Sequence, residues 1–282
     1  MKANPLPGPV HPTQFSGEEI KALVLDLDGT LLTGEKTVGP RTFRALQLLR
    51  ERGLKLVIAS GRTYGTAKAY TESLDIREPY VLANGALVVE SQTGKVLLSH
   101  PLDWDVSRTS ITLGRRAGLH IHLFADRLYY EVDDPHERQM DPLCFEQGKQ
   151  VNFDDIFFPE LTKLLLVGDE NASRGVVEEL HRRFPGRLYA ARSAPGYYEV
   201  MNSRANKAAG VREVARMLSI PMSRFLAIGD AENDMEMLSQ AGISAAMGNG
   251  MAAVKEIADY VLGTNNEDAI GVFLEEFFKI LT

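Results

Sequence analysis

The chain has 282 residues, of which 44% are hydrophobic, and a formal net charge of −7 at pH 7. This length allows one large domain or two smaller ones, and the acidic balance argues against a nucleic-acid-binding protein, which needs a basic surface to neutralise phosphates. Cys144 is the single cysteine, so an intrachain disulfide and a cysteine-rich zinc site are both excluded.

Nothing in the sequence predicts export or insertion into a membrane. No apolar stretch reaches the ~18 residues that a membrane span needs, and residues 1–19 lack the apolar core of a signal peptide. This leader is rich in proline, so we expect a flexible N-terminal arm over residues 1–19. We expect a cytoplasmic protein with neither a membrane partner nor a nucleic-acid partner.

Two carboxylates follow the first predicted strand. The apolar run 22–25 leads directly into Asp26, Leu27, Asp28, Gly29 and Thr30. An ionised carboxylate away from water is costly unless it is paired or binds a metal. The placement of Asp26 and Asp28 therefore indicates a site that needs a cation or a proton, as a phosphoryl-transfer site does.

Three further apolar runs end in polar clusters. They are 54–59, followed by Ser60, Gly61 and Arg62; 80–83, followed by Asn84 and Gly85; and 225–228, followed by the acidic segment 229–234. Uninterrupted apolar runs that alternate with helical patterns, here 42–52 and 207–218, are typical of parallel strands with helices on both faces. We predict an α/β fold with a doubly wound, Rossmann-like parallel sheet, whose ligands bind beyond the carboxyl ends of the strands.

The parallel pattern stops after Gly85, and an α+β pattern replaces it. The predicted elements are a hairpin of 86–90 and 95–99, helices at 106–117 and 172–184, and strands at 120–124, 128–132, 163–167, 188–191 and 197–201. We therefore predict a discontinuous core, residues 20–85 and 201–282, with an inserted α+β cap over residues 86–200. Hinges are expected near residues 84–86 and 202–206.

These motifs resemble the haloacid dehalogenase (HAD) superfamily, in particular Cof-type phosphatases with a type IIB cap. The matching segments are 26–30, 60–62, Lys207 and 229–234. The resemblance covers about residues 20 to 275, and it implies a magnesium-dependent phosphatase.

The roles of the two aspartates follow from the chemistry that each position must supply. Asp26 is expected to attack phosphorus as an ionised nucleophile. Asp28 is expected to protonate the leaving oxygen and later to activate water, which requires a higher pKa than that of Asp26.

Phosphate-binding groups are expected from Leu27, Ser60, Gly61, Lys207 and Asn233. Ser60 and the backbone of Gly61 are expected to donate hydrogen bonds at the start of the next helix. Arg62 either binds phosphate or supports the helix start, and it is left outside the group that contacts phosphate.

Magnesium is the expected cofactor, because hard oxygen ligands suit it. The resemblance implies that its ligands are the Asp26 carboxylate, the Asp28 backbone carbonyl and Asp230. Supporting roles are expected for Asp234, Thr30 and Asn84.

Cap residues are harder to assign. His120 and His122 share a face of one predicted strand and are expected to be ordinary cap residues. Two interpretations of Tyr197, Tyr198 and Glu199 stay open, since these residues could line the substrate side of the cap or simply pack along a strand.

The predicted function is magnesium-dependent hydrolysis of small soluble phosphate monoesters, such as sugar phosphates or phosphorylated cofactors, through an aspartyl-phosphate. One alternative is a phosphomutase or phosphotransferase of the phosphomannomutase type, for which the basic pairs Arg115–Arg116 and Arg182–Arg183 are the candidates to bind a second phosphate. The other is a non-catalytic metabolite-binding protein. The sequence specifies neither the substrate nor the choice between a monomer and a small homo-oligomer.

Overall fold

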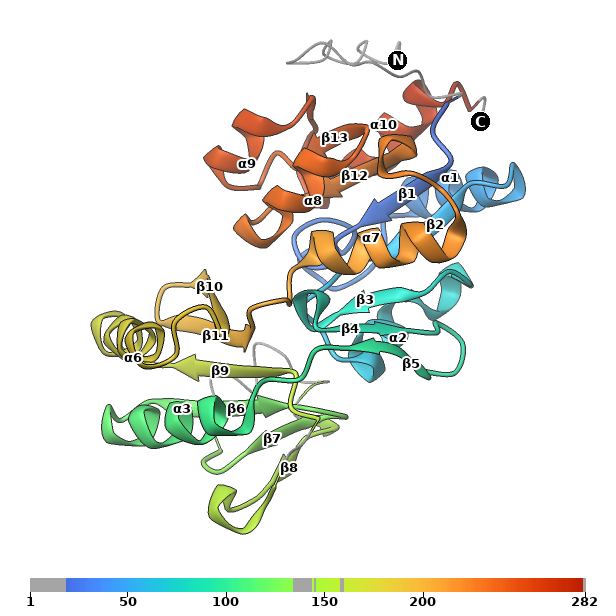
Figure 1. The fold of residues 1–282 in the computed structure, drawn as a ribbon. Helices are drawn as coiled ribbons and strands as arrows, with labels where there is room; N and C mark the ends of the chain where they lie inside the picture. Colours follow the sequence, from blue (N-terminus) through green and yellow to red (C-terminus); the bar gives the residue numbers. More distant parts are fainter. Residues whose placement is uncertain (1–18, 134–143, 145, 158–159, 281–282) are drawn as a thin grey trace.

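The computed structural model describes residues 19–133, 144, 146–157 and 160–280 of the chain (Figure 1). The predicted arm over residues 1–19 therefore lies almost wholly outside the described residues. Among the described residues, no helix is both long and apolar enough to cross a bilayer.

A parallel sheet of five strands forms the centre of the core, in the order β14-β13-β12-β1-β2. Its strands are β1 (Ala22–Leu25), β2 (Lys55–Ile58), β12 (Phe225–Gly229), β13 (Ile243–Ala246) and β14 (Tyr260–Val261), and all neighbouring pairs are parallel. The strand β1 lies between β2 and β12, so the polar segments that follow these three strands meet at one edge of the sheet.

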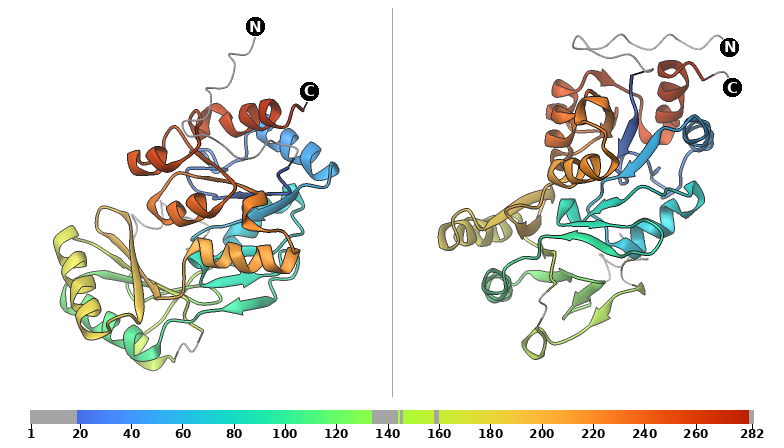
Figure 2. Two further views of the ribbon diagram at one scale, coloured as in Figure 1. Left: turned by 45° about the horizontal axis from the view of Figure 1, so that its top comes forward. Right: turned by 45° about the vertical axis from the view of Figure 1, so that its right-hand side comes forward.

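Helices cover both faces of this sheet, which explains why its strands are apolar without alternation. On one side lie α1 (Pro40–Glu51), α2 (Tyr64–Thr71) and α10 (Ala269–Phe277), and on the other α7 (Lys207–Leu218), α8 (Met235–Gln240) and α9 (Ala252–Ile257) (Figure 2). Leu23 and Leu25 of β1 pack into the first hydrophobic cluster, and Ala22 and Val24 pack into the second. The doubly wound core predicted from the sequence is confirmed.

A small antiparallel sheet lies beside the parallel one. It contains β3 (Tyr80–Leu82), β4 (Leu87–Val89) and β5 (Val96–Ser99). The segment 80–83 was expected to be one more parallel strand. It does meet the end of β2 through the parallel bridge between Ala59 and Val81 and the hydrogen bond from the Ser60 amide to the Val81 carbonyl, but its ladder partner is the antiparallel strand β4. The side chains of β3 and β4 pack into both core clusters, so we propose that the cap begins after His100 instead of at residue 86.

The cap contains a mixed six-stranded sheet with helices on one face (Figure 1). Its strands, in the order β10-β11-β9-β6-β7-β8, are β6 (His120–Phe124), β7 (Leu128–Tyr130), β8 (Lys149–Gln150), β9 (Lys163–Val167), β10 (Leu188–Ala194) and β11 (Tyr197–Asn202); its helices are α3 (Trp104–Arg116) and α6 (Glu170–Arg183). Ile121, Leu123, Leu164 and Leu166 pack in the cluster beneath the helices. The alternate residues of β6 and β9 therefore face the other way, toward the core.

Short 3-10 helices complete the described structure. They are η1 (Glu72–Leu74), η2 (Ala83–Gly85), η3 (Phe153–Asp155), η4 (Met222–Arg224), η5 (Glu232–Asp234) and η6 (Asn265–Glu267). The backbones of the two expected hinges touch, because a Cβ on Gly85 would lie 2.0 Å from the carbonyl oxygen of Asn206. Gly85 has a φ of +92°, so both the close approach and the backbone conformation require glycine here.

Candidate active site

A cavity of about 360 Å³ lies between the edge of the parallel sheet and the cap. Its core-side lining includes Asp26, Asp28, Ser60, Gly61, Arg62, Asn84, Asp230 and Asn233; its cap-side lining includes His122, Phe124, Leu128, Cys144, Lys163, Leu165 and Glu199. The polar segments predicted to converge are therefore brought together, and the cap adds a second wall.

A buried lysine links two aspartates on the floor of this site. Lys207 is the first residue of α7, and the Asn206 side chain caps the helix by accepting from the Ala209 amide. The Nζ atom of Lys207 donates to Asp26 Oδ1 at 2.5 Å and to Asp234 Oδ1 at 2.7 Å. Burial lowers the pKa of the Lys207 ammonium, but Asp234 and Asp26 raise that pKa by more, so Lys207 stays charged.

Burial acts in the opposite direction on the carboxyl groups. It raises the pKa of Asp26 well above its usual value, against the opposing charge of Lys207, and it raises the pKa of Asp230 to about 6. Both carboxylates would be stabilised in the ionised form by a further positive charge.

Three carboxylates provide the place for that charge. One carboxylate oxygen from each of Asp26, Asp230 and Asp234 lies within 4.8 Å of the others. Asp234 already accepts hydrogen bonds from the Asp230 and Ala231 amides and from Lys207, which suits it to holding the loop. The set of hard oxygen donors fits a divalent cation such as magnesium.

Gly29 allows Asp230 to approach this cluster closely. Its φ is +80°, and a Cβ there would lie 2.5 Å from Asp230 Oδ2. Asp230 is held in place by the Thr30 hydroxyl, which donates to Oδ1 at 2.7 Å. The position of Asp230 thus depends on the residues of the first motif.

We expect Gly29→Ala to weaken metal binding, because the added methyl group displaces the Asp230 carboxylate. The magnesium concentration that gives half-maximal activity should rise about tenfold or more. Gly53→Ala is the matched control, since Gly53 has a φ of +87° but open space around its Cβ position. An equal change in both variants would show that backbone strain, and not displacement of Asp230, causes the effect.

The Asp28 carboxylate accepts hydrogen bonds from two cationic side chains that were not expected to contact it. Arg62 donates to it from Nε at 2.6 Å and from Nη2 at 2.7 Å, and Lys36 Nζ donates at 2.6 Å. Burial raises the pKa of Asp28, but Arg62 and Lys36 lower it to about 2. The expected order, with Asp28 above Asp26, is therefore reversed in this structure. Arg62 was expected either to bind phosphate or to support the helix start, and its contact with Asp28 was not predicted; Lys36 was missed altogether.

Ser60 and Gly61 were expected at the start of a helix, but they lie in a loop. The helix α2 begins at Tyr64 with Thr63 as its N-cap, so Ser60 and Gly61 precede it. The Ser60 hydroxyl accepts from the Arg62 amide at 3.2 Å. Any anion bound here is therefore held by this loop and not by the helix dipole.

Asn84 and Asn233 connect two of the core loops. Asn233 Nδ2 donates to Asn84 Oδ1 at 3.0 Å, and Asn84 in turn donates to Glu199 of the cap. Leu27 has a fully buried side chain that packs in the core, so only its backbone is available to a ligand.

The cap-side residues follow the alternation along their strands. His122 and Phe124 on β6 and Lys163 and Leu165 on β9 line the cavity, whereas His120 lines a separate cavity. His122 was expected to be an ordinary cap residue, and Lys163 was missed. The alternation of β9 is the signal that could have found Lys163.

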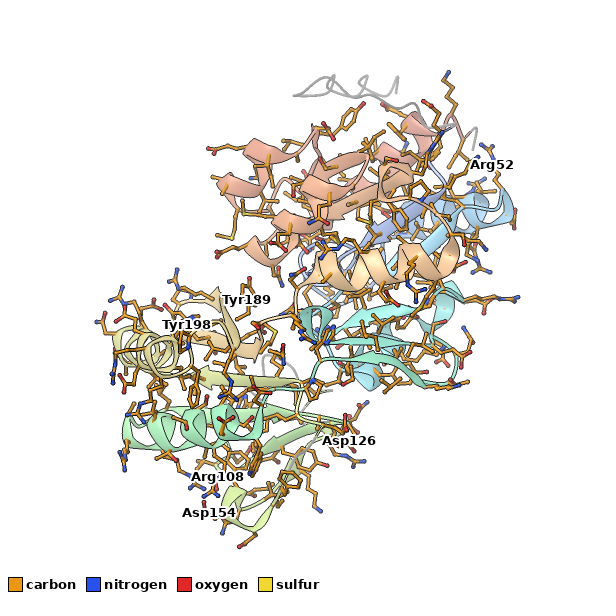
Figure 3. All side chains as sticks on the ribbon, viewed as in Figure 1. Arg52, Arg108, Asp126, Asp154, Tyr189 and Tyr198 are labelled. Carbon is orange, nitrogen blue, oxygen red and sulfur yellow. The ribbon has the colours of Figure 1, made fainter. Side chains whose placement is uncertain are left out.

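The two arginine pairs considered for a second phosphate do not line this cavity. Arg115 forms ion pairs with Glu131 and Asp154, and Asp154 lies at the outer end of the cap (Figure 3). Arg182 and Arg183 are both paired with Glu179 on α6. Neither arginine pair is therefore available to bind a second phosphate in the described part of the pocket.

Comparison with known proteins identifies the family. Residues 23–274 match the model of the haloacid dehalogenase-like hydrolases. The chain belongs to this family. Since that match spans both the core and the cap, the HAD-like hydrolase expected from the motifs is confirmed over almost the whole described chain.

Curated and solved relatives cover most of the length of this HAD-like hydrolase. The chain is 31% identical over 268 residues to 5-amino-6-(5-phospho-D-ribitylamino)uracil phosphatase YitU of Bacillus subtilis, which spans 92% of this chain and 97% of that protein. A haloacid dehalogenase-like hydrolase from Bacteroides thetaiotaomicron is 30% identical, with a TM-score of 0.83 over 92% of this chain and all of that one. The expected phosphatase is thereby confirmed.

The expected cap type is confirmed by a further solved structure. A phosphatase described as a HAD subclass IIB sugar phosphatase superposes with a TM-score of 0.81, covering 91% of this chain and 98% of that one. At 22% identity this likeness concerns the fold, including the inserted cap of the HAD-like hydrolase.

Proposed function

We propose that the protein hydrolyses small phosphate monoesters with Mg²⁺ and through a phosphorylated Asp26. The observation that carries this proposal is the buried contact of Lys207 with Asp26 and Asp234 beside Asp230. One lysine and several carboxylates at the base of a cavity suit the transfer of a phosphoryl group, because the protein contributes mainly positioning and charge stabilisation.

The proposed reaction has two steps on one carboxylate. Asp26 attacks phosphorus, the bond from phosphorus to the ester oxygen breaks, and Asp28 gives a proton to that leaving oxygen. Arg62 and Lys36 hold the pKa of Asp28 at about 2 in this structure, so this step requires that substrate binding displaces the two cations from the Asp28 carboxylate and lets it take up the proton. Asp28 then takes a proton from water, the water oxygen attacks phosphorus, and the bond to Asp26 breaks. Inorganic phosphate leaves, and both aspartates return to their first state.

The remaining residues bind and orient the phosphoryl group. Ser60, Gly61 and Asn233 line the cavity and would hold its oxygens, and Lys207 would provide a fixed positive charge next to Asp26. Asp26, the Asp28 backbone carbonyl and Asp230 would hold Mg²⁺. The bound cation would neutralise negative charge on the transferring group.

The size of the cavity favours small phosphorylated metabolites. About 360 Å³ is near the lower end of the range of ligand pockets, roughly 300–1,000 Å³. The curated relative YitU is named for a phosphorylated ribitylaminouracil, and such an ester is among the substrates that we propose for this protein.

The test is release of inorganic phosphate from sugar phosphates, nucleotides, pyridoxal phosphate, flavin mononucleotide and the ribitylaminouracil ester. We expect release with magnesium and a loss of at least about a hundredfold with excess chelator. The proposal would be contradicted if no ester of the panel released phosphate, or if isomerised sugar phosphate formed in place of free phosphate.

A further inference from the structure

A buried ion pair in the cap faces the cavity. Lys163 of β9 and Glu199 of β11 are 5% and 8% exposed, and Nζ lies 2.9 Å from Oε1. In the register of the two strands Lys163 is opposite Met201, so Glu199 lies diagonally across from it on the same face of the sheet. Buried ion pairs seldom stabilise a fold more than apolar residues of the same size, so stability alone does not explain this pair.

The same pair contacts the two core loops that flank the phosphate position. Lys163 Nζ donates to the Gly61 carbonyl oxygen at 3.0 Å, and Asn84 donates to Glu199 Oε2. The two side chains therefore lie above the loop that carries Ser60 and Gly61. The first atoms of a leaving group attached to a phosphate at that loop would meet them.

The rest of the cap wall is mainly apolar. Lys163 Nζ lies 4.5 Å from the centre of the Phe124 ring, and Leu128 and Leu165 continue the wall. The pair thus offers one ammonium donor and one carboxylate acceptor, with no net charge, in apolar surroundings. Hydroxyl groups can bond to both members, whereas a second phosphate would meet a cation that is already neutralised and a carboxylate that repels it.

We propose that Lys163 and Glu199 select the leaving group, favouring an uncharged group that carries hydroxyls over one that carries a second phosphate. This inference rests on the proposed phosphatase function and deepens it. The carboxylate of Glu199 is the discriminating element, because it cancels the attraction that Lys163 alone would exert on a second anion.

The experiment compares kcat/KM for fructose 6-phosphate and fructose 1,6-bisphosphate in the wild type and in Glu199→Gln. The wild type should prefer the monophosphate. In the variant the ratio of monophosphate to bisphosphate should fall at least about tenfold, because activity on the bisphosphate rises while activity on the monophosphate falls. A purely structural role for Glu199 would lower both values together and leave their ratio unchanged.

The matched control is Glu179→Gln, which removes a carboxylate from an ion pair on the outer helix α6. Its substrate ratio should equal that of the wild type.

The double variant Lys163→Met with Glu199→Leu provides a second test without an unpaired buried charge. Its kcat/KM ratio of fructose 6-phosphate to 4-nitrophenyl phosphate should fall at least about tenfold, because the aryl ester carries no hydroxyl for the pair to bind.

The outcomes separate the two proposals. An unchanged mono- to bisphosphate ratio in Glu199→Gln, or a wild type that prefers the bisphosphate, would overturn the selection by this pair and leave the phosphatase function standing. Hydrolysis of 4-nitrophenyl phosphate but not of fructose 6-phosphate would do the same. No magnesium-dependent hydrolysis of any of the three esters would overturn the proposed function and this inference together.

Discussion

Asp26→Asn is expected to abolish phosphatase activity while the fold stays intact. The amide is isosteric and can still accept the hydrogen bond from Lys207, but it cannot attack phosphorus. A loss of at least roughly a thousandfold in kcat is expected. The measurement is magnesium-dependent phosphate release, together with thermal unfolding of the same preparation.

Stability should change little in this variant. Asp26 is one of three clustered carboxylates and shares Lys207 with Asp234, and burial raises its pKa, so its ionised form is costly without metal. Asp126→Asn, at an exposed position of the cap, is the control and should keep full activity. An Asp26→Asn protein that turns over at the wild-type rate would remove the covalent mechanism.

Lys207→Met is expected to have the largest effect on stability. The side chain is 1% exposed and lies between Asp26 and Asp234, so its loss leaves buried carboxylates without their counter-charge. Removal of one partner from a buried ion pair costs about 3–5 kcal/mol. The free energy of unfolding, measured in urea without metal, should fall by that amount.

Two comparisons make this result specific. Lys21→Met removes an exposed lysine directly before β1 and should leave the free energy of unfolding within about 0.5 kcal/mol of the wild type. Magnesium should restore part of the stability of Lys207→Met, because a cation ligand of the folded state supplies the missing charge. A stability equal to that of the wild type would show that the carboxylates do not depend on Lys207.

The sequence predicted most of the core, because its signals there are local. The apolar runs ending at Leu25 and Ile228 became neighbouring parallel strands, and the periodic segment 207–218 is helix α7 with the same bounds. The contact of Lys207 with Asp26 joins residues far apart in the chain. It was expected only because the motifs resemble those of the HAD superfamily, since Lys207 begins a helix after a cap strand and does not follow a strand of the parallel sheet.

What the sequence did not predict depends on tertiary contacts. Nothing local shows that Arg62 folds back to hold both oxygens of Asp28, so the low pKa of Asp28 in this structure was not predicted. The hairpin β4–β5 was assigned to the cap because its antiparallel pattern resembles that of the cap; since the side chains of β4 pack on the core, we propose that it belongs to the core. Of the cap wall, only Glu199 was among the residues considered for the substrate side. The rest was missed because the face that each strand turns to the core depends on how the cap sits.

The two walls of the cavity come from separate stretches of the chain. Residues that would act on phosphorus lie in the segments 26–30, 60–62, 207 and 229–234, whereas Phe124, Lys163 and Glu199 belong to the stretch inserted between them. Substitutions in that stretch can therefore change which ester is accepted without altering a group that breaks or forms a bond. In evolution and in engineering alike, substrate preference can therefore change through the cap-side lining of the cavity while the reaction stays the same.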